Sequence, residues 1–455
     1  MSQVSITFLG ATDTVTGSRF LITGPSSRIL IDCGMFQGGK PIRSRNWESF
    51  PAEPASINAV VLTHAHIDHS GFLPALVRDG FSGPIFCTPA TAELVELLLR
   101  DSAHLQEEEA RYANKKKSSR HVPAKPLFTI SDAEAAIKLL EVRKFGVMFS
   151  PAPGFEVSFS RAGHILGAAS VRVVENGVSL LVSGDLGQQG DLVMHEPDSP
   201  PEADYVLIES TYGDRLHATE DPFEVLKKVI TKTITNGGSV LFPAFAVGRS
   251  QVLMHILAEL RHQERIPNVP IYLNSPMATD VTDMYLRYAS EHNLSDEQCS
   301  RIWSGIEFVQ TIEQSKELTS SSEPKIIISA SGMATGGRVL HHLIQMLPHS
   351  QNTVVFAGHQ VEGTRGFLLV DGLKQIRIYG DDVNVFANIV HMEELSAHAD
   401  RDELISWIKK SPSKPKKVFV VHGEPDAAAS LQQIIRDEMH WTVEIARHGQ
   451  ITELS

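Results

Sequence analysis

A run of three histidines and one aspartate most strongly constrains what this chain can fold into. It lies in the sequence Thr-His-Ala-His-Ile-Asp-His at positions 63–69, directly after an apolar segment that we predict to be a β-strand. A strand delivers the following loop rigidly to one sheet edge, where several short side chains can converge. Imidazole nitrogens and carboxylate oxygens suit zinc, and the run contains no cysteine, which favours a catalytic site over a structural one. The run therefore predicts a catalytic metal centre, the alternative being a solvated polar loop.

The first third of the chain alternates short apolar runs with polar turns, which predicts a domain rich in β-strands. Helical patterns lie between the runs, and the third of them opens with the capping box Ser131-Asp132-Ala133-Glu134. The expected strands are 4–9, 20–23, 29–32, 59–63, 84–87, 155–162, 168–182 (a pair) and 205–209, and the expected helices are 72–78, 92–109 and 131–145.

From about residue 214 the pattern changes to a regular alternation of strands and helices, which predicts a parallel, doubly wound insertion. After about residue 386 we expect a strand, a helix at 400–410, a strand at 417–421 and a last helix. A chain of 455 residues exceeds what one hydrophobic core usually serves. We therefore expect two domains, or one domain with a large insertion.

Composition narrows the class of protein further. With 42% hydrophobic and 21% charged residues, the chain is typical of a globular protein. A net charge of -13 argues against broad adhesion to a polyanion, although a local cationic groove or bound metal ions can still capture phosphates. Three cysteines are too few for a disulfide framework, and neither a leader pattern nor a run of about 18 apolar residues is present. We expect a cytoplasmic protein with no membrane partner.

The run from His64 to His69 resembles the signature of the metallo-β-lactamase superfamily. Three later motifs resemble its nucleic-acid-processing branch, the β-CASP nucleases: Ile-Glu-Ser-Thr-Tyr-Gly around Glu209, Leu-Ser-Ala-His-Ala-Asp around His398, and Val-His-Gly-Glu around His422. The resemblance spans essentially the whole chain. It implies an α/β fold, an αββα sandwich with an inserted β-CASP domain, divided into residues 1–213, 214–386 and 387–455.

The resemblance also implies two zinc ions per chain. In the family, further ligands come from a Gly-His-x-x-Gly and a Ser-Gly-Asp context, and this chain has both, at the ends of predicted strands. Asp32, in Ile-Leu-Ile-Asp-Cys-Gly, is expected to orient the histidine loop rather than bind metal. The implied ligands are His64, His66 and His164 for one ion, Asp68, His69 and His422 for the other, and Asp185 as a bridge.

Glu209 is expected to hydrogen-bond His398, so that a protonated imidazole can reach the leaving oxygen of a substrate. The simpler alternative for Glu209 is a helix cap at a strand end. Within the family, the identity of one residue in the third motif differs between members that act on RNA and members that act on DNA. RNA-processing members resemble this chain in carrying His, as at His422, whereas the DNA repair branch typically carries Val.

Three loops of the insertion are rich in small residues, which let backbone N–H groups and helix N-termini approach a phosphate. Taken alone, such loops are more often simple tight turns. A basic run, Arg111 with Lys115, Lys116, Lys117 and Arg120, is by default a solvated helix end and otherwise an RNA contact. The expected phosphate-binding residues are Ser275, Ser331, Gly332, Thr335, Arg338 and Arg365.

The function implied is zinc-dependent hydrolysis of RNA phosphodiester bonds, which leaves a 3′-hydroxyl and a 5′-phosphate. The chain resembles the endonuclease of messenger-RNA 3′ processing and its short prokaryotic relatives, and 5′-3′ exonuclease activity is left open. The alternatives are a small-molecule hydrolase of the thioesterase or lactonase type, a DNA nuclease, and a non-catalytic RNA scaffold. RNA is the expected partner, and the oligomeric state is open, a homodimer being one arrangement.

Overall fold

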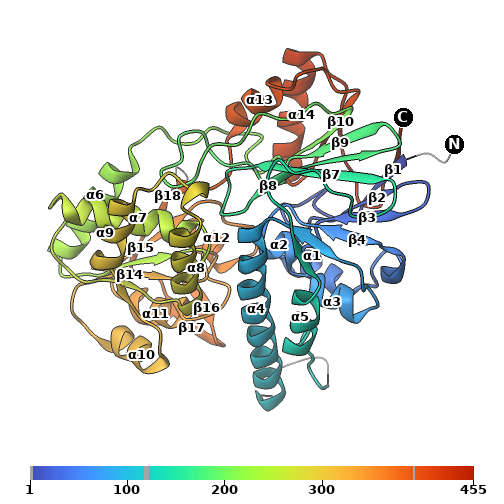
Figure 1. Ribbon diagram of the computed structural model, residues 1–455. Helices are drawn as coiled ribbons and strands as arrows, with labels where there is room; N and C mark the ends of the chain where they lie inside the picture. Colours follow the sequence, from blue (N-terminus) through green and yellow to red (C-terminus); the bar gives the residue numbers. More distant parts are fainter. Residues whose placement is uncertain (1–3, 117–121, 393–394) are drawn as a thin grey trace. The chain divides into compact units, whose positions relative to one another are not determined.

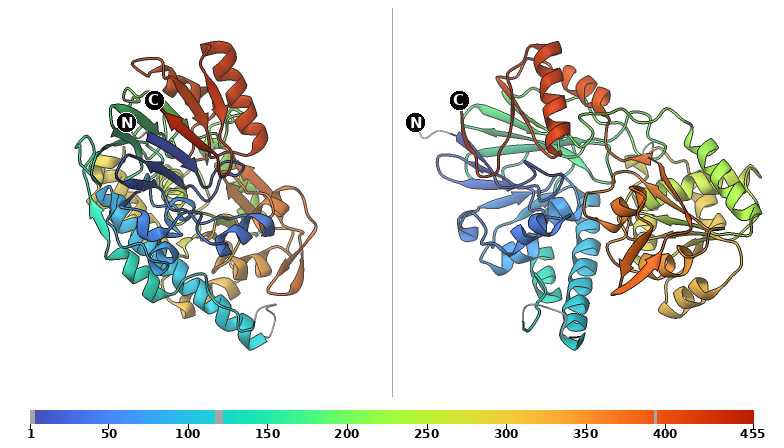
Figure 2. Two further views of the ribbon diagram at one scale, coloured as in Figure 1. Left: turned by 90° about the vertical axis from the view of Figure 1, so that its right-hand side faces the viewer. Right: turned by 180° about the vertical axis from the view of Figure 1, so that it is seen from behind.

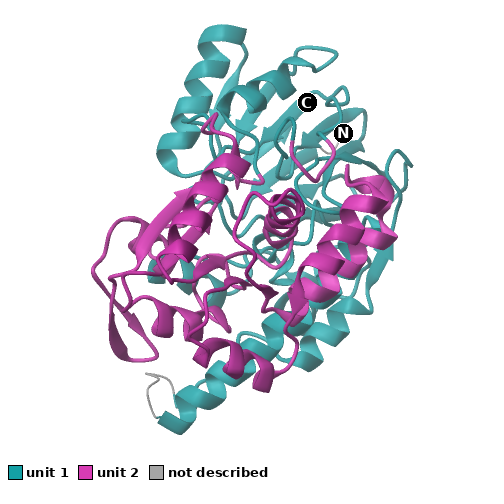
Figure 3. Cartoon of the chain, turned by 90° about the vertical axis from the view of Figure 1, so that its left-hand side faces the viewer, with its two compact units in different colours: residues 1–190, 196–216, 398–455 teal, residues 191–195, 217–397 magenta. Residues whose placement is uncertain are grey.

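The computed structural model describes residues 4–116, 122–392 and 395–455. The chain divides into two compact units (Figure 3): unit 1 comprises residues 1–190, 196–216 and 398–455, and unit 2 comprises residues 191–195 and 217–397. The sequence-based domain boundaries after residues 213 and 386 stay a prediction. Within the described ranges, no helix is long and apolar enough to cross a lipid bilayer.

Unit 1 contains two mixed sheets that face each other across one core. The first has the strand order β21-β1-β2-β3-β4-β5-β6, and the second has the order β20-β19-β10-β9-β8-β7. The strands of the first sheet are β1 (Val4–Phe8), β2 (Phe20–Thr23), β3 (Arg28–Ile31), β4 (Ala59–Val61), β5 (Ile85–Cys87), β6 (Leu140–Val142) and β21 (Ile451–Leu454). Those of the second are β7 (Phe155–Arg161), β8 (Ala169–Glu175), β9 (Val178–Val182), β10 (Tyr205–Ile208), β19 (Lys417–Val420) and β20 (Val443–Ile445).

The inner faces of the two sheets bury a continuous apolar core, which includes Phe8, Phe20, Phe155, Phe159 and Phe419. Helices α3 and α4 pack on α5 beside the first sheet (Figure 1). Helix α14 packs on β19 and β20 of the second sheet. This αββα sandwich confirms the predicted fold. The helices of unit 1 are α1 (Lys40–Ser44), α2 (Ile67–Ser70), α3 (Leu73–Arg78), α4 (Pro89–Lys116), α5 (Ile130–Ile137), α13 (Arg401–Lys409) and α14 (Pro425–Met439).

The sequence-based prediction ended on a helix, whereas the chain continues into two more strands. β20 pairs in parallel with β19, and β21 pairs antiparallel with β1, which brings segments near the two ends of the chain side by side (Figure 2). Both strands are short and only partly buried, so neither shows a clear apolar pattern. Their pairing depends on the sheet edges that the rest of the chain provides.

The helix expected at residues 131–145 was wrong at both ends. Helix α5 is capped by Thr129, whose Oγ1 accepts a hydrogen bond from the backbone N–H of Asp132, while the Asp132 carboxylate accepts one from the N–H of Thr129. This capping box lies two residues before the predicted one. The helix ends at Ile137 because the following residues form β6, which pairs in parallel with β5.

Unit 2 is built on a six-stranded sheet with the order β13-β12-β14-β11-β15-β18, in which each neighbouring pair is parallel. This confirms the predicted parallel sheet. The strands are β11 (Val240–Pro243), β12 (Ile271–Leu273), β13 (Glu307–Phe308), β14 (Ile326–Ser329), β15 (Thr353–Ala357) and β18 (Asn388–Met392). The helices are α6 (Pro222–Thr235), α7 (Arg249–His262), α8 (Pro276–Arg287), α9 (Asp296–Gly305), α10 (Ile312–Ser320), α11 (Val339–Met346) and α12 (Arg365–Val370).

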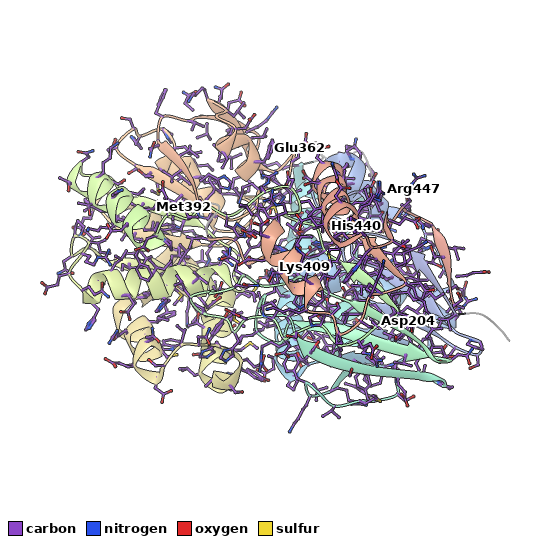
Figure 4. The ribbon with its side chains drawn as sticks, turned by 90° about the horizontal axis from the view of Figure 1, so that it is seen from above. Asp204, Glu362, Met392, Lys409, His440 and Arg447 are labelled. Carbon is purple, nitrogen blue, oxygen red and sulfur yellow. The ribbon has the colours of Figure 1, made fainter. Side chains whose placement is uncertain are left out.

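The edge strand β18 returns the chain toward unit 1. Its last residue is Met392, which is labelled in Figure 4 and is fully buried. The Met392 carbonyl accepts a hydrogen bond from the N–H of Gly358 at 2.9 Å. Before β18 the chain forms an antiparallel hairpin, β16 (Gln375–Ile378) and β17 (Asp381–Asn384), which the sequence analysis did not predict.

Candidate metal centre

The histidine loop follows β4, and a neighbouring segment after β3 holds its backbone. The N–H groups of Cys33 and Met35 donate to the carbonyls of His69 and Ile67 at 2.8 and 2.9 Å. Between them, Gly34 lies so close to the loop that a Cβ at this position would sit 1.6 Å from the Asp68 carbonyl oxygen. Only glycine fits there, and the loop conformation is fixed before any metal ligand is considered.

Asp32 is fully buried and connects the histidine loop to β3. Its Oδ1 accepts the N–H of Thr63 at 2.8 Å, and its Oδ2 lies 2.7 Å from His69 Nδ1. A carboxylate on one ring nitrogen fixes the imidazole orientation and leaves the other nitrogen to act as a ligand. The structure thus directs Nε2 of His69 into the centre, in line with the orienting role expected for Asp32.

The first group of candidate ligands gathers three imidazole nitrogens. His64 Nε2 and His164 Nε2 lie 3.1 and 3.2 Å from His66 Nδ1, and they lie 3.5 and 3.7 Å from Asp185 Oδ2. Four ligand atoms arranged tetrahedrally at about 2.0–2.1 Å from zinc are separated by about 3.3 Å. The observed separations fit that arrangement.

The second group lies on the opposite oxygen of Asp185. His69 Nε2 and His422 Nε2 are 3.0 Å apart, and they lie 3.3 and 3.6 Å from Asp185 Oδ1. Asp68 Oδ2 lies 3.6 Å from His422 Nε2 and 3.8 Å from His69 Nε2. Asp185 Oδ1 is buried without a well-formed hydrogen bond within the described part of the chain. Nitrogen and oxygen donors gathered around such an atom fit a divalent metal ion.

Burial and mutual charge determine the protonation of these groups. Burial lowers the pKa of His66 to about 4 and that of His64 well below its usual value, which keeps both imidazoles neutral, as metal ligands must be. Burial alone would raise the pKa of Asp185, but the charges of His422 and His69 outweigh it and hold the pKa well below the usual range. Asp185 is therefore a carboxylate.

His398 and Glu209 lie beside this centre, on the side of Asp185 Oδ2. His398 Nδ1 is 3.3 Å from Glu209 Oε1 and 3.9 Å from Asp185 Oδ2. Burial by itself would lower the pKa of His398, but the charge of Glu209 and its hydrogen bond raise the pKa above the ordinary value. The arrangement favours an imidazolium. These three residues are also close enough to hold a metal ion themselves.

The topology of unit 1 explains why residues so distant in sequence meet. Asp185, Glu209 and His422 follow β9, β10 and β19, which are neighbouring parallel strands. The carboxyl ends of parallel strands open at the same sheet edge, so the three loops converge. The loop of His398 is attached to this edge because the N–H of Ala399 donates to the Leu186 carbonyl at 2.7 Å. All predicted ligands, with Asp32, Glu209 and His398, therefore lie together in unit 1.

The predicted phosphate-binding residues lie in unit 2, where several have internal partners. Ser275 is buried, and its Oγ caps α8 by accepting the N–H of Ala278 at 3.2 Å. Ser331 Oγ lies 3.0 Å from Thr335 Oγ1 and accepts the Thr335 N–H at 3.1 Å. Gly332 packs so closely that a Cβ would sit 2.8 Å from the Phe245 ring.

The two arginines predicted to bind phosphate donate to the protein itself. Arg338 donates to Asn274 Oδ1 at 2.9 Å and to the carbonyls of Val309 and Gln310 at 3.0 and 2.7 Å. Arg365 donates to the carbonyls of Arg377 and Thr335 at 3.0 and 3.1 Å. Their direct contact with a phosphate stays a prediction, and the structure adds a role in holding the loops.

Sequence reasoning missed the buried polar group behind these loops. Asn274 Nδ2 donates to His342 Nε2 at 2.6 Å and to Ser315 Oγ at 2.9 Å. Asn274 Oδ1 accepts a hydrogen bond from Arg338. The side chains of Asn274 and His342 are essentially inaccessible to solvent. Of the basic run, Lys115 and Lys116 are exposed at the end of α4, and Lys117 and Arg120 lie outside the described residues.

Comparison with known proteins agrees with this geometry. Residues 13–226 match the metallo-beta-lactamase superfamily, residues 250–369 the Beta-Casp domain, and residues 382–446 the Zn-dependent metallo-hydrolase RNA specificity domain. A crystal structure of a protein of unknown function from Enterococcus faecalis superposes over the whole of both chains with a TM-score of 0.55 at 13% identity, which supports the fold alone.

Two relatives align along nearly the whole chain. Ribonuclease TTHA0252 of Thermus thermophilus is 36% identical over 449 residues, which are 97% of this chain and 98% of that protein. Transcription termination factor FttA of Methanocaldococcus jannaschii is 30% identical over 95% of this chain and 69% of its own length. The chain therefore belongs to the β-CASP family of metallo-hydrolases within the metallo-β-lactamase superfamily.

Proposed function

We propose that this chain is a zinc-dependent ribonuclease that hydrolyses RNA phosphodiester bonds and leaves a 3′-hydroxyl and a 5′-phosphate. The observation that carries the proposal is the shared carboxylate of Asp185, whose two oxygens face two separate groups of ligands while His398 lies alongside. The ribonuclease name of the Thermus relative and the RNA specificity domain matched at residues 382–446 support RNA as the substrate.

The donor set fits two zinc ions. His64, His66 and His164 would hold one ion with Asp185, and the remaining ligands, Asp68, His69 and His422, would hold the other with the same carboxylate. When bound there, zinc supplies Lewis acidity, which lowers the pKa of water and neutralises charge on a phosphate. Asp32 contributes by fixing the ring of His69 through Nδ1.

His398 holds the proton that the leaving oxygen needs. Because Nδ1 faces Glu209, the opposite ring nitrogen, Nε2, is the atom that hands over the proton. Glu209 is fully buried and accepts the N–H of Leu186 at 2.6 Å, so its carboxylate is fixed in place. A positioned general acid of this kind contributes a rate factor of about 10² to 10⁴.

The alternatives on the same fold predict different substrates. A thioesterase or lactonase needs only the metal ligands and has no use for an inserted β-CASP domain, which this chain has at residues 250–369. A DNA nuclease would cleave DNA whose base sequence matches that of the RNA substrate. We further propose a cytoplasmic location, because Cys33, Cys87 and Cys299 are all free thiols, as is usual in a reducing compartment.

Cleavage mapping tests the proposal. The zinc-loaded protein is incubated with single-stranded RNA labelled at its 5′ or 3′ end, with DNA of the same sequence, and with a thioester and a lactone. We expect RNA fragments that an RNA ligase can rejoin, because ligation needs a 3′-hydroxyl and a 5′-phosphate. Comparing the two labels separates internal cuts from stepwise 5′-3′ degradation. Intact RNA beside a hydrolysed thioester, or equal cleavage of DNA, would contradict the proposal.

Asp185→Asn is the variant that removes the shared charge, and His349→Ala is the control. His349 is exposed in unit 2 and belongs to none of the ligand groups. We expect Asp185→Asn to lose cleavage together with bound zinc, and His349→Ala to retain both. Equal cleavage by Asp185→Asn and the wild type would mean that the observed cleavage does not come from this metal centre.

A further inference from the structure

The turn of the β16–β17 hairpin carries an unusual residue. Ile378 pairs with Asp381, so the connection consists of Tyr379 and Gly380 alone, with φ angles of +52° and +98°. Positive φ at both positions is the signature of a type I′ turn, in which Asn-Gly or Gly-Gly is strongly preferred. A tyrosine in the left-handed region is a strained choice. Residues held in such strained backbone conformations cluster at functional sites.

The ring of Tyr379 is half-exposed and packs on a second aromatic side chain. His341, at the exposed face of α11, has its ring centroid 5.2 Å from that of Tyr379, with an angle of 34° between the ring planes. The Tyr379 hydroxyl lies 3.5 Å from His341 Nε2, and 49% of Tyr379 is accessible. The imidazole thus supports one side of the tyrosine, and about half of the tyrosine remains accessible to solvent.

Arg365 ties this pair to the loop from Ser331 to Arg338. Its Nε donates to the Arg377 carbonyl, two residues before Tyr379, at 3.0 Å. Its Nη1 donates to the carbonyls of Ala334 and Thr335 at 3.3 and 3.1 Å. Arg365 therefore connects the hairpin to the loop within unit 2, and Tyr379 follows two residues after the hairpin carbonyl that Arg365 binds.

The charges of the hairpin oppose one another. Arg377 pairs across the strands with Asp382, and the exposed residues Lys374 and Asp381 add one charge of each sign. The hairpin alone therefore offers no net cationic surface to a polyanion. A contact made at Tyr379 depends on the ring rather than on ion pairing.

We propose that Tyr379, supported by His341, is a stacking site for a nucleobase of single-stranded RNA. This inference rests on the proposed ribonuclease function and adds a binding site to it. Unstacked bases pack on aromatic side chains in sequence-tolerant fashion, because every base has a π-face. The strained turn presents the ring, His341 supports it, and Arg365 sets its position relative to the loop.

The decisive variant is Tyr379→Asn. It removes the ring and leaves Asn-Gly, the preferred type I′ pair, so the hairpin is expected to be at least as stable as in the wild type. Binding is measured by fluorescence anisotropy with a single-stranded RNA that contains 2-aminopurine, in a His398→Ala background to slow cleavage. We expect the Kd of Tyr379→Asn to rise between about 5-fold and 150-fold, the range for loss of one stacked base.

Two further readouts identify stacking as the cause. At saturating protein, 2-aminopurine fluorescence should be quenched at one position of the RNA by wild-type and Tyr379→Phe protein but not by Tyr379→Asn. The ratio of the Kd values of Tyr379→Asn and wild type should also stay constant between low and high salt, whereas both Kd values rise with salt. Phe386→Ala removes another ring, 63% exposed, from unit 2 and is the matched control.

The outcomes separate this inference from the proposed function. If wild-type protein cleaves and binds RNA while Tyr379→Asn binds within twofold and quenches normally, the stacking site is wrong and the ribonuclease stands. An affinity loss that disappears at high salt would show an electrostatic effect and also overturn the stacking site. Failure of the wild-type protein to bind or cleave RNA would overturn both.

Discussion

His398 points its Nδ1 at Glu209 Oε1, 3.3 Å away, and the same carboxylate oxygen accepts the backbone N–H of Leu186 at 2.6 Å. The carboxylate is therefore fixed from a neighbouring loop before it meets the imidazole. His398 also lies 3.9 Å from Asp185 Oδ2, so two roles have to be separated by experiment. The experiment distinguishes the proposed role as a proton donor from a role as an additional ligand.

The first prediction is that replacing His398 by Ala lowers the rate of RNA cleavage by about 10² to 10⁴ with zinc content unchanged. The reason is that the other ligands already give each ion four protein donors, counting Asp185 twice. Steady-state cleavage and elemental analysis of the same preparation measure both quantities. A 3′-phosphorothiolate leaving group scarcely needs protonation. The His398→Ala protein should therefore cleave an RNA with that leaving group at nearly the wild-type rate. Loss of one zinc, or an equal defect on that substrate, would make His398 a ligand or a structural residue.

The second prediction concerns the pH dependence of cleavage. Glu209 raises the pKa of His398, and the proton donor is active only while it is protonated. Activity should therefore decline as the pH rises through the pKa of His398. Glu209→Gln removes the charge and keeps an oxygen for the Leu186 N–H, so its decline should begin at lower pH. Single-turnover rates from pH 5 to 10 provide the test, and coincident profiles for the two proteins would contradict it.

The third prediction is that the protein binds about two zinc ions and that the two groups can be emptied separately. His422→Ala should reduce the content to about one ion by weakening the group with Asp68 and His69. His349→Ala, an exposed histidine, should retain two. Elemental analysis after dialysis measures the content. An active wild-type protein with one ion or none would contradict the assignment.

The fourth prediction separates the two parts of the Ser331 loop. Arg338→Ala removes three hydrogen bonds, including the one to buried Asn274, and should lower the free energy of unfolding by about 1–3 kcal/mol. Ser331→Ala should change the free energy of unfolding by under about 1 kcal/mol, because within the described residues the Ser331 hydroxyl bonds to Thr335 of the same turn. Both variants should weaken RNA binding with zinc retained. Urea unfolding and filter binding measure the effects, with exposed Arg436→Ala as the control, and unchanged RNA affinity in both variants would exclude the loop from the RNA site.

Sequence patterns predicted the strand-rich first domain, the parallel sheet and the metal-binding run at residues 63–69, because each of these depends on local signals, whereas the sandwich and the remaining ligands were implied by the family resemblance. His64, Asp185 and His422 all directly follow apolar runs that form strands. The convergence of those loops could not be worked out from spacing, since it requires the parallel order β9, β10 and β19. The family resemblance supplied that information.

The sequence-based predictions failed where two local signals compete, where the usual turn signal is missing, or where a hydrogen-bond partner is distant in sequence. Thr129-x-x-Asp132 and Ser131-x-x-Glu134 are overlapping capping boxes, and the structure uses the first. The β16–β17 turn has Tyr379 where a typical hairpin has Asn, so the signal was absent. The partners of Arg338 lie 28 to 64 residues away in sequence, and no local pattern reveals them.

The last prediction concerns His342, whose buried position makes unit 2 sensitive to acid. Burial lowers the pKa of His342 to about 3, and the nearby charges of His341, Lys325 and Arg338 act in the same direction. Its Nε2 accepts a hydrogen bond from Asn274, so the ring is neutral in the folded protein. Unfolding restores an ordinary pKa of about 6.5, and the unfolded chain then binds a proton that the folded one excludes.

The sign of the effect follows from that difference. The stabilisation of the folded protein that comes from a neutral His342 is fully present above pH 6.5. It is lost as the pH falls from about 6.5 toward 3, by about 1.4 kcal/mol per pH unit. His342→Gln keeps an acceptor for Asn274 without the titration. Between pH 7 and 5, zinc-loaded wild-type protein should therefore lose about 2 kcal/mol more unfolding free energy than His342→Gln, measured by urea titration. His349→Gln is the control for removing an exposed histidine, and equal losses in wild type and His342→Gln would mean that His342 is protonated in the folded state.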